Sequence, residues 1–216
     1  MNYKTIDMDS FPRRAHFEYF KGLAYPYVGF TVNVDITGFL AQQKRLGLPF
    51  YLALAYCVTR AANSVPEFRR RIHGDGIIEY DWCHGSHTVA LPDDTYCYCT
   101  LDCRMPFDEY LPRAAEAWER AKAASSIEDG EDADSLLFFS SIPWMSFTSV
   151  IQPTPSPADS NPRINWGRYF RQDGKVLLPL AVLCNHALVD GLHISRFYSA
   201  LDRELAELTD RLGDMG

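Results

Sequence analysis

The residues best suited to chemistry lie near the C-terminus, where His186 and Asp190 stand four positions apart. His186 directly follows the apolar run 176–184, a predicted strand, and precedes a helix predicted from about residue 192 to residue 212. An imidazole with a pKa of about 6.5 suits general-base catalysis near neutral pH. Asp190 and Gly191 add a carboxylate and a permissive backbone position. Isolated histidines at strand ends are more often structural, so these residues alone leave both interpretations open.

A second group of potential ligands is the cysteine- and histidine-rich segment 83–103. Its members are Cys83, His84, His87, Cys97, Cys99 and Cys103. Zinc sites usually take paired ligands from a tight turn, as in CxxC or HxxxH. Cys97 and Cys99 instead alternate along a predicted strand, so they share one face with no turn between them. We therefore predict small buried side chains and no metal, and keep a zinc-dependent protein as an alternative.

Composition predicts a soluble globular protein with a substantial core, because 47% of the 216 residues are apolar and 13% are aromatic. The net charge is −7, and the one short basic run, 69–71, fits a solvated helix end about as well as a binding patch, so we expect no nucleic-acid partner. The longest apolar runs have nine residues, whereas a membrane-spanning helix needs about 20. The N-terminus lacks the apolar region of a signal peptide, and the six cysteines do not suggest a secreted disulfide framework. We expect a cytoplasmic protein with no membrane partner and a single domain over residues 1–216.

Helices and strands alternate along the chain. Predicted helices run from about residue 39, with Thr37 as a possible cap, to Gly47, and over 50–63, 107–124 and 192–212. Predicted strands cover 27–34, 76–80, 87–91, 95–103, 136–140, 144–151, 164–171 and 175–184. The acidic segment 128–134 and the proline-rich segment 153–162 are expected to be surface loops. Hairpin signals outnumber βαβ units, which predicts an α/β fold with a mixed, largely antiparallel sheet flanked by helices.

Short motifs occur in one order along nearly the whole chain. They are RRxHF (13–17), VDIT (34–37), FY (50–51), PEFR (66–69), IPWxSFTS (142–149), LPLAV (178–182) and HAxxDGxHxxRF (186–197). Each motif is weak by itself, but together and at this spacing they resemble the chloramphenicol acetyltransferase family. The resemblance implies the coenzyme A-dependent acyltransferase fold. It also implies a homotrimer in which the histidine of one subunit faces the pocket of its neighbour.

The resemblance implies a role for each catalytic position. His186 is the base that takes a proton from a substrate hydroxyl, which then attacks the acetyl-CoA thioester directly. Ser149 donates a hydrogen bond to the tetrahedral oxyanion. Asp190 pairs with Arg13 rather than with the histidine, and His193 is structural. No acyl-enzyme is needed, so Cys184 is expected to pack in its strand and not to act as a nucleophile.

The resemblance also implies positions that bind the substrate or co-substrate. They are Asn165, Tyr169, Tyr51, Phe20, Tyr27 and Val28. Tyr51 and Tyr169 match aromatic positions near the coenzyme's adenine, and Asn165 stands where relatives use a threonine that helps to hold a water. Two departures concern the site: Asn185 replaces the first of the paired histidines, and Pro26-Tyr27-Val28 replaces a Cys/Gly/Phe-type triplet in the acceptor pocket.

We therefore expect an acetyl-CoA-dependent O-acetyltransferase that acts on a small hydroxyl acceptor, with chloramphenicol as the leading acceptor and antibiotic resistance as the role. Residues 150–162, which would form one wall of the acceptor pocket, are rich in Pro, Ser and Asp. Such a wall is less apolar than that of the relatives and should bind a nitrophenyl drug less well. One alternative is an acetyltransferase for another small alcohol. Another is a catalytically silent trimer or small-molecule binding module with the same fold.

Overall fold

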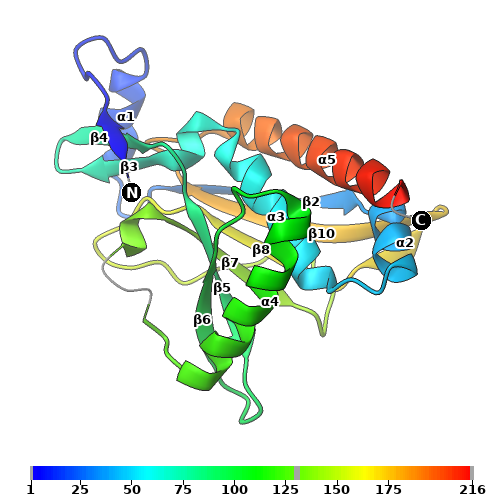
Figure 1. Ribbon diagram of the computed structural model, residues 1–216. Helices are drawn as coiled ribbons and strands as arrows, with labels where there is room; N and C mark the ends of the chain where they lie inside the picture. Colours follow the sequence, from blue (N-terminus) through cyan, green and yellow to red (C-terminus); the bar gives the residue numbers. More distant parts are fainter. Residues whose placement is uncertain (1, 129–131, 215–216) are drawn as a thin grey trace.

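A seven-stranded mixed sheet forms the centre of the fold (Figure 1). The computed structural model describes residues 2–128 and 132–214. The strand order is β2-β10-β8-β7-β5-β6, with β9 also paired to β10; β7 is parallel to β5 and β8, and the other pairs are antiparallel. The strands are β2 (Tyr27–Asp35), β5 (His84–Ala90), β6 (Tyr96–Leu101), β7 (Leu136–Ile142), β8 (Arg163–Gly167), β9 (Phe170–Gln172) and β10 (Lys175–Asn185). The prediction of a mixed, largely antiparallel sheet is confirmed.

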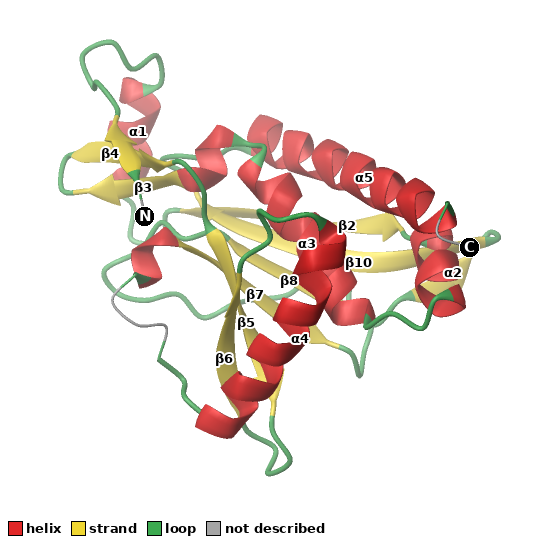
Figure 2. Ribbon diagram, viewed as in Figure 1, coloured by secondary structure: helices red, strands yellow, loops and turns green. Residues whose placement is uncertain are grey.

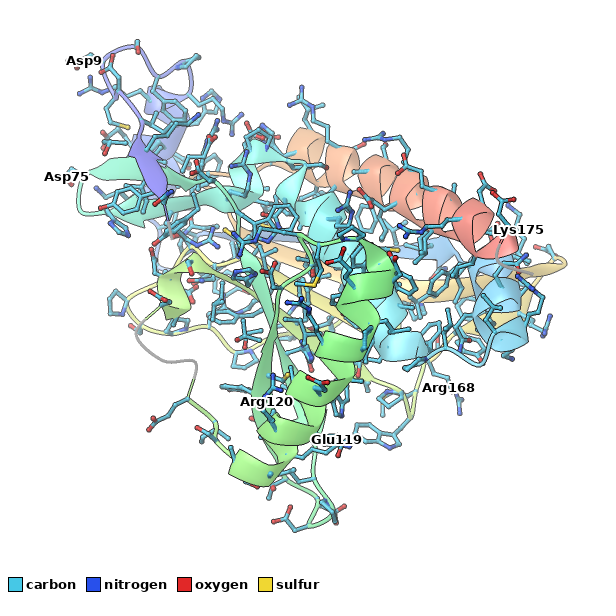
Figure 3. All side chains as sticks on the ribbon, viewed as in Figure 1. Asp9, Asp75, Glu119, Arg120, Arg168 and Lys175 are labelled. Atoms are coloured by element: carbon cyan, nitrogen blue, oxygen red, sulfur yellow. The ribbon has the colours of Figure 1, made fainter. Side chains whose placement is uncertain are left out.

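Helices cover one face of this sheet (Figure 2). They are α2 (Thr37–Arg45), α3 (Phe50–Asn63), α4 (Phe107–Ala124) and α5 (Gly191–Gly213), and the last three match the predicted helices to within one residue at each end. Eleven of the fourteen residues of α3 are buried because it lies between the sheet, α4 and α5. Charged side chains such as Asp75, Arg120 and Lys175 lie at the periphery (Figure 3).

A smaller sheet and a short helix lie together at one end of the molecule, next to the first strand of the chain (Figure 1). The sheet has the strand order β1-β4-β3. These elements are β1 (Tyr3–Thr5), α1 (Arg14–Lys21), the 3-10 turn η1 (Pro66–Arg69), β3 (Arg70–His73) and β4 (Gly76–Tyr80). The predicted strand over 76–80 is confirmed, and a tight hairpin turn at Gly74, where φ is +58°, joins it to β3.

The basic run 69–71 is neither a solvated helix end nor a binding patch. Arg69 and Arg70 face Glu79, with Arg70 Nε 3.0 Å from its carboxylate. Arg71 is fully buried, and its guanidinium donates to the backbone oxygens of Asp134 at 2.6 Å and Leu136 at 2.8 Å. The run therefore joins the smaller sheet to the start of β7. The sequence could not predict this because the acceptor carbonyls lie more than sixty residues away.

Thr37 is the first residue of α2 and not its cap. The carboxylate of Asp35 accepts hydrogen bonds from the Thr37 backbone N at 3.0 Å and from its hydroxyl at 2.6 Å. The Thr37 hydroxyl oxygen in turn accepts from the backbone N of Val176 at 2.9 Å. Its side chain thus ties the start of the helix to β10.

The predicted strand over 144–151 is wrong, because residues 143–162 form a loop without strand pairing. The reason lies in the topology. β7 and β8 are adjacent and parallel, so the chain that leaves β7 must return along the sheet before β8 can begin. The predicted loop over 153–162 belongs to this crossover, although Ser160 and Asn161 at its end are buried. Of the acidic segment 128–134, residues 129–131 lie outside the described residues, and 133–135 form a 3-10 turn.

Replacing Arg71 by methionine should lower the free energy of unfolding by about 3–5 kcal/mol, because buried carbonyl oxygens lose a charged donor. Urea denaturation of the two proteins measures the difference. Arg113→Met is the matched control, since Arg113 is exposed on α4, and it should change stability by less than about 0.5 kcal/mol. Equal stability of the two variants would contradict the role given to Arg71.

Candidate active site

A tight turn between β10 and α5 holds His186. The backbone N of His186 donates to the carbonyl oxygen of Pro26, just before β2, at 2.7 Å. The backbone N of Val189 donates to the Asn185 carbonyl at 3.0 Å, and the Asn185 side-chain oxygen accepts from the backbone N of Ala187 at 3.1 Å. These hydrogen bonds fix the turn without any contact from the His186 side chain.

The His186 ring has one defined orientation. Its Nδ1 lies 2.9 Å from the carbonyl oxygen of Val189. A carbonyl can only accept, so Nδ1 carries the proton in the neutral ring and Nε2 keeps a free lone pair. The ring of Phe20, on α1, stacks on the imidazole with centroids 3.8 Å apart. Phe20, which was predicted to bind substrate, thus contacts the histidine itself and holds its plane.

Asp190 braces the turn and does not bond to His186. Its Oδ2 lies 2.5 Å from Nη1 of Arg13, as predicted, and its Oδ1 accepts from the backbone N of Leu192 at 3.0 Å, which caps α5. Burial alone would raise the pKa of Asp190, but the hydrogen bonds from Arg13 and the Leu192 backbone and the charge of Arg13 outweigh it, so the pKa is lowered. The carboxylate is therefore ionised at neutral pH.

His193 has the opposite tautomer to His186. Its Nδ1 accepts a hydrogen bond from the backbone N of Asp190 at 3.0 Å, so the proton is on Nε2, which faces Glu67 at 3.7 Å. Burial lowers the pKa of His193, which keeps the ring neutral. His193 completes the cap of α5, and this is the structural role predicted for it.

The face of the sheet opposite the helices carries a cavity of about 610 Å³. Its floor comes from β5, β7 and β8, and its wall comes from β6 and residues 142–153. Asn165 lines it and is only 6% exposed. Tyr27, Val28 and His186 are not among the lining residues.

Sequence reasoning missed a cluster between this cavity and the His186 turn. Asp159 accepts from Arg163 through both oxygens, at 2.8 and 2.7 Å, and from the Tyr27 hydroxyl at 3.0 Å. The Asn185 side chain donates to the Asp159 carbonyl at 2.9 Å. Burial and the Asp159 charge raise the pKa of Tyr27 to about 12. Asp159 and Arg163 stand four residues apart across a proline, but nothing local in the sequence indicates that they face Tyr27.

Within one chain, Ser149 and His186 lie toward opposite ends of β8. Ser149 is exposed in the crossover loop, two residues after Phe147, whose ring packs against Gly167. Arg163 of β8 pairs with Leu183 of β10, and Gly167 lies four residues along β8 from Arg163. His186 lies three residues beyond Leu183 in the opposite direction. At about 3.3 Å per residue this separates Gly167 from His186 by roughly 20 Å. Ser149 therefore follows the chain at the Gly167 end of β8, whereas His186 lies beyond the Arg163 end.

The two tyrosines predicted near the adenine occupy different environments. The Tyr51 ring lies among His87, Trp118 and Trp166, with centroids 4.9–5.1 Å away, and its buried hydroxyl has no hydrogen-bond partner among the described residues. Tyr169 is partly exposed, with Lys44 Nζ 5.8 Å from its ring centroid.

The cysteines are all free and buried. Within the described ranges 2–128 and 132–214, no three His, Cys, Asp or Glu side chains are grouped so that they could hold a metal ion. The zinc alternative therefore lacks a ligand set in this part of the chain. Burial raises the pKa of Cys184 far above neutral, so its thiol stays protonated and is a poor nucleophile. No helix among these residues is long and apolar enough to cross a membrane.

Comparison with known proteins gives the family. A sequence model of chloramphenicol acetyltransferase matches residues 1–202. The chain belongs to the chloramphenicol acetyltransferase family. A chloramphenicol acetyltransferase of Clostridium perfringens is 31% identical over 99% of this chain and all of its own length, and one of Escherichia coli is 29% identical over 93% of each chain. The family establishes the chain as an acyltransferase.

Solved structures agree with this fold. A chloramphenicol acetyltransferase structure covers 94% of this chain and 100% of its own, with a TM-score of 0.83 and 24% identity. The cubic core of a pyruvate dehydrogenase multienzyme complex covers 90% of this chain and 87% of its own, with a TM-score of 0.65 and 20% identity. At these identities the likeness concerns the fold alone.

Replacing Asp190 by asparagine should lower the free energy of unfolding by about 2 kcal/mol at pH 7, because the Arg13 guanidinium loses its counter-ion. A carboxyl with a lowered folded pKa stabilises above its unfolded pKa of about 3.9 and loses that contribution as the pH falls through the folded value. The difference from wild type should therefore shrink between pH 7 and pH 3. Denaturant unfolding at both pH values measures it, with exposed Asp210→Asn as control. A difference that is independent of pH would contradict the ion pair.

Proposed function

We propose that this chain is an acetyl-CoA-dependent O-acetyltransferase, with chloramphenicol as the first acceptor to test. The observation that carries the proposal is the free Nε2 lone pair of His186, fixed by the Nδ1 contact with Val189 at 2.9 Å, in a chain of this family. If chloramphenicol is the acceptor, antibiotic resistance in the cytoplasm is the biological role. The relatives named above support that acceptor because their own names include it.

In the proposed reaction, His186 Nε2 takes the proton of the acceptor hydroxyl as its oxygen attacks the thioester carbonyl carbon. Ser149 donates a hydrogen bond to the resulting oxyanion. The tetrahedral intermediate then expels the thiolate of coenzyme A, which takes a proton from the imidazolium. The products are the acetate ester and free coenzyme A, and His186 is neutral again.

Because His186 and Ser149 of one chain lie toward opposite ends of β8, we propose that the site forms between subunits of a homotrimer. The edge strand β2 supports an interface, since Phe30 and Val32 on it are 49% and 40% exposed. An exposed apolar edge strand normally pairs with or is covered by another chain. A cyclic trimer would repeat one such contact three times.

Thiol release from acetyl-CoA tests the activity directly. Wild type should release coenzyme A when chloramphenicol is added, and His186→Ala should lose at least about a hundredfold in rate, as expected for removal of a general base. Ser149→Ala should lower kcat by about 10²–10³, as for removal of an oxyanion donor. Activity only with other alcohols would move the proposal to another acceptor, and no release with any alcohol would favour a binding module.

Mixed oligomers test the shared site. When His186→Ala and Ser149→Ala chains are co-expressed in equal amounts, each inactive alone, random assembly should restore about a quarter of the wild-type activity, because about a quarter of the interfaces receive both intact residues. Co-purification through two different tags verifies mixing. If the mixed oligomer is no more active than the parents, each site belongs to a single chain.

A further inference from the structure

The backbone pairing between β2 and β10 has few hydrogen bonds at the end next to His186. The last register pair is Tyr27 with Asn185. Beyond it, the backbone N of His186 donates to the Pro26 carbonyl oxygen at 2.7 Å. Because antiparallel pairs that exchange backbone bonds alternate with pairs that do not, Tyr27 and Asn185 share none, and Pro26 can return none because proline lacks an N–H. One backbone bond therefore joins His186 to β2.

The side chains of this last pair bond to Asp159. Opposite residues that share no backbone bonds bring their side chains close together on one face of the sheet. The Tyr27 hydroxyl donates to the Asp159 carboxylate at 3.0 Å, and the Asn185 side chain donates to the Asp159 carbonyl oxygen at 2.9 Å. One residue thus bonds to both strands at the position just before His186. We call Asp159, Tyr27 and Asn185 the Asp159 clamp.

The Asp159 clamp is anchored to a third strand. Arg163 on β8 donates to both carboxylate oxygens of Asp159, at 2.8 and 2.7 Å, and a bidentate pair fixes direction as well as distance. Arg163 is only 9% exposed and Asn185 only 2%, so water competes little for these bonds. The guanidinium carbon also lies 6.0 Å from the centroid of the Tyr27 ring. Asp159 is therefore fixed by β8 and can in turn fix the ends of β2 and β10.

Two departures from the family pattern supply the donors of the Asp159 clamp. Asn185 stands where the first of the paired histidines is expected, and Tyr27 stands in the triplet that differs at the start of β2. These positions are far apart in the sequence, yet they are register partners and both bond to Asp159. The Asp159 clamp is therefore built from residues at which this chain differs from its relatives.

The place of the Asp159 clamp links it to the candidate base. Strand ends open more readily than strand centres. Opening of the last pair would move the backbone N of His186, and with it the ring whose Nδ1 lies 2.9 Å from the Val189 carbonyl oxygen. A displacement of about 1 Å at a reacting group can cost about a hundredfold in rate.

We propose that Asp159 is a positioning residue for the acetyl transfer, acting through Tyr27 and Asn185 on the backbone of His186. The inference rests on the acetyltransferase proposed above. The Asp159 carboxylate already accepts from Arg163 and Tyr27, so its part is to hold the backbone and not to take up a proton. Tyr27, for which the resemblance implied contact with substrate, thereby supports the base.

Steady-state kinetics of two variants test the assignment. Asp159→Asn turns one acceptor oxygen of the clamp into a donor, and Tyr27→Phe removes the hydroxyl and keeps the ring. Each should lower kcat for thiol release by about tenfold or more, because His186 is displaced. KM for acetyl-CoA and for the acceptor should stay within about twofold. The double variant should be no slower than the slower single variant, because both changes act through one clamp.

Two controls make the same chemical changes elsewhere. Asp210→Asn on α5 and Tyr3→Phe on β1 alter exposed side chains and should change neither kcat nor KM. Thermal melting of every variant checks that it folds.

Amide hydrogen exchange followed by NMR tests the Asp159 clamp without any reaction. The His186 amide should exchange at least about tenfold faster in Asp159→Asn and in Tyr27→Phe than in wild type. The amide of Ala181, in the middle of β10 with a strand on either side, should exchange at the wild-type rate.

An unchanged exchange rate at His186 in both variants would overturn the proposal. A raised KM for the acceptor with kcat unaltered would also overturn it, because the clamp would then bind substrate and not position the base. If wild type releases no thiol with any alcohol, the acetyltransferase is contradicted instead. The exchange rates then still decide whether Asp159 holds His186 in place.

Discussion

The ion pair between Arg13 and Asp190 holds the two ends of the chain together at the candidate active site. It spans 177 positions in sequence, and its carboxylate also caps α5. Because Asp190 closes the turn that begins at His186, the same interaction sets the path of the backbone on which the histidine sits. It also places the start of α1 beside this turn, and α1 in turn supplies Phe20, whose ring stacks on the imidazole. A charge-assisted bond of this geometry is stronger than a neutral one and fixes direction as well as distance.

Around this pair, backbone groups decide what each histidine can do. His186 and His193 lie seven residues apart in one motif, yet a carbonyl faces Nδ1 of the first and an amide N–H faces Nδ1 of the second. The first ring therefore keeps its lone pair at Nε2, where a hydroxyl could reach it. The second uses its lone pair inside the cap of α5 and, being buried, stays neutral. The two rings hold their protons on different nitrogens because a carbonyl oxygen faces Nδ1 of His186 and a backbone N–H faces Nδ1 of His193.

Helices cover only one face of the central sheet, and the other face is therefore partly open. Helices bury the Trp166 side, so the opposite side keeps an open cavity. The parallel step from β7 to β8 forces a long return loop, and that loop both carries Ser149 and forms a wall of the cavity.

The sequence by itself determined the helices α3, α4 and α5, most strands and the family, because periodicity and local motifs are written in consecutive residues. Through the resemblance it also predicted the pair of Arg13 with Asp190. Tertiary structure alone decided that residues 144–151 form a loop, that Arg71 is buried against distant carbonyls, and that Asp159 and Arg163 adjoin the His186 turn. It also decided which side chains of β5, β7 and β8 line the cavity, since strand register sets which side chains become neighbours, and register depends on pairing between distant segments.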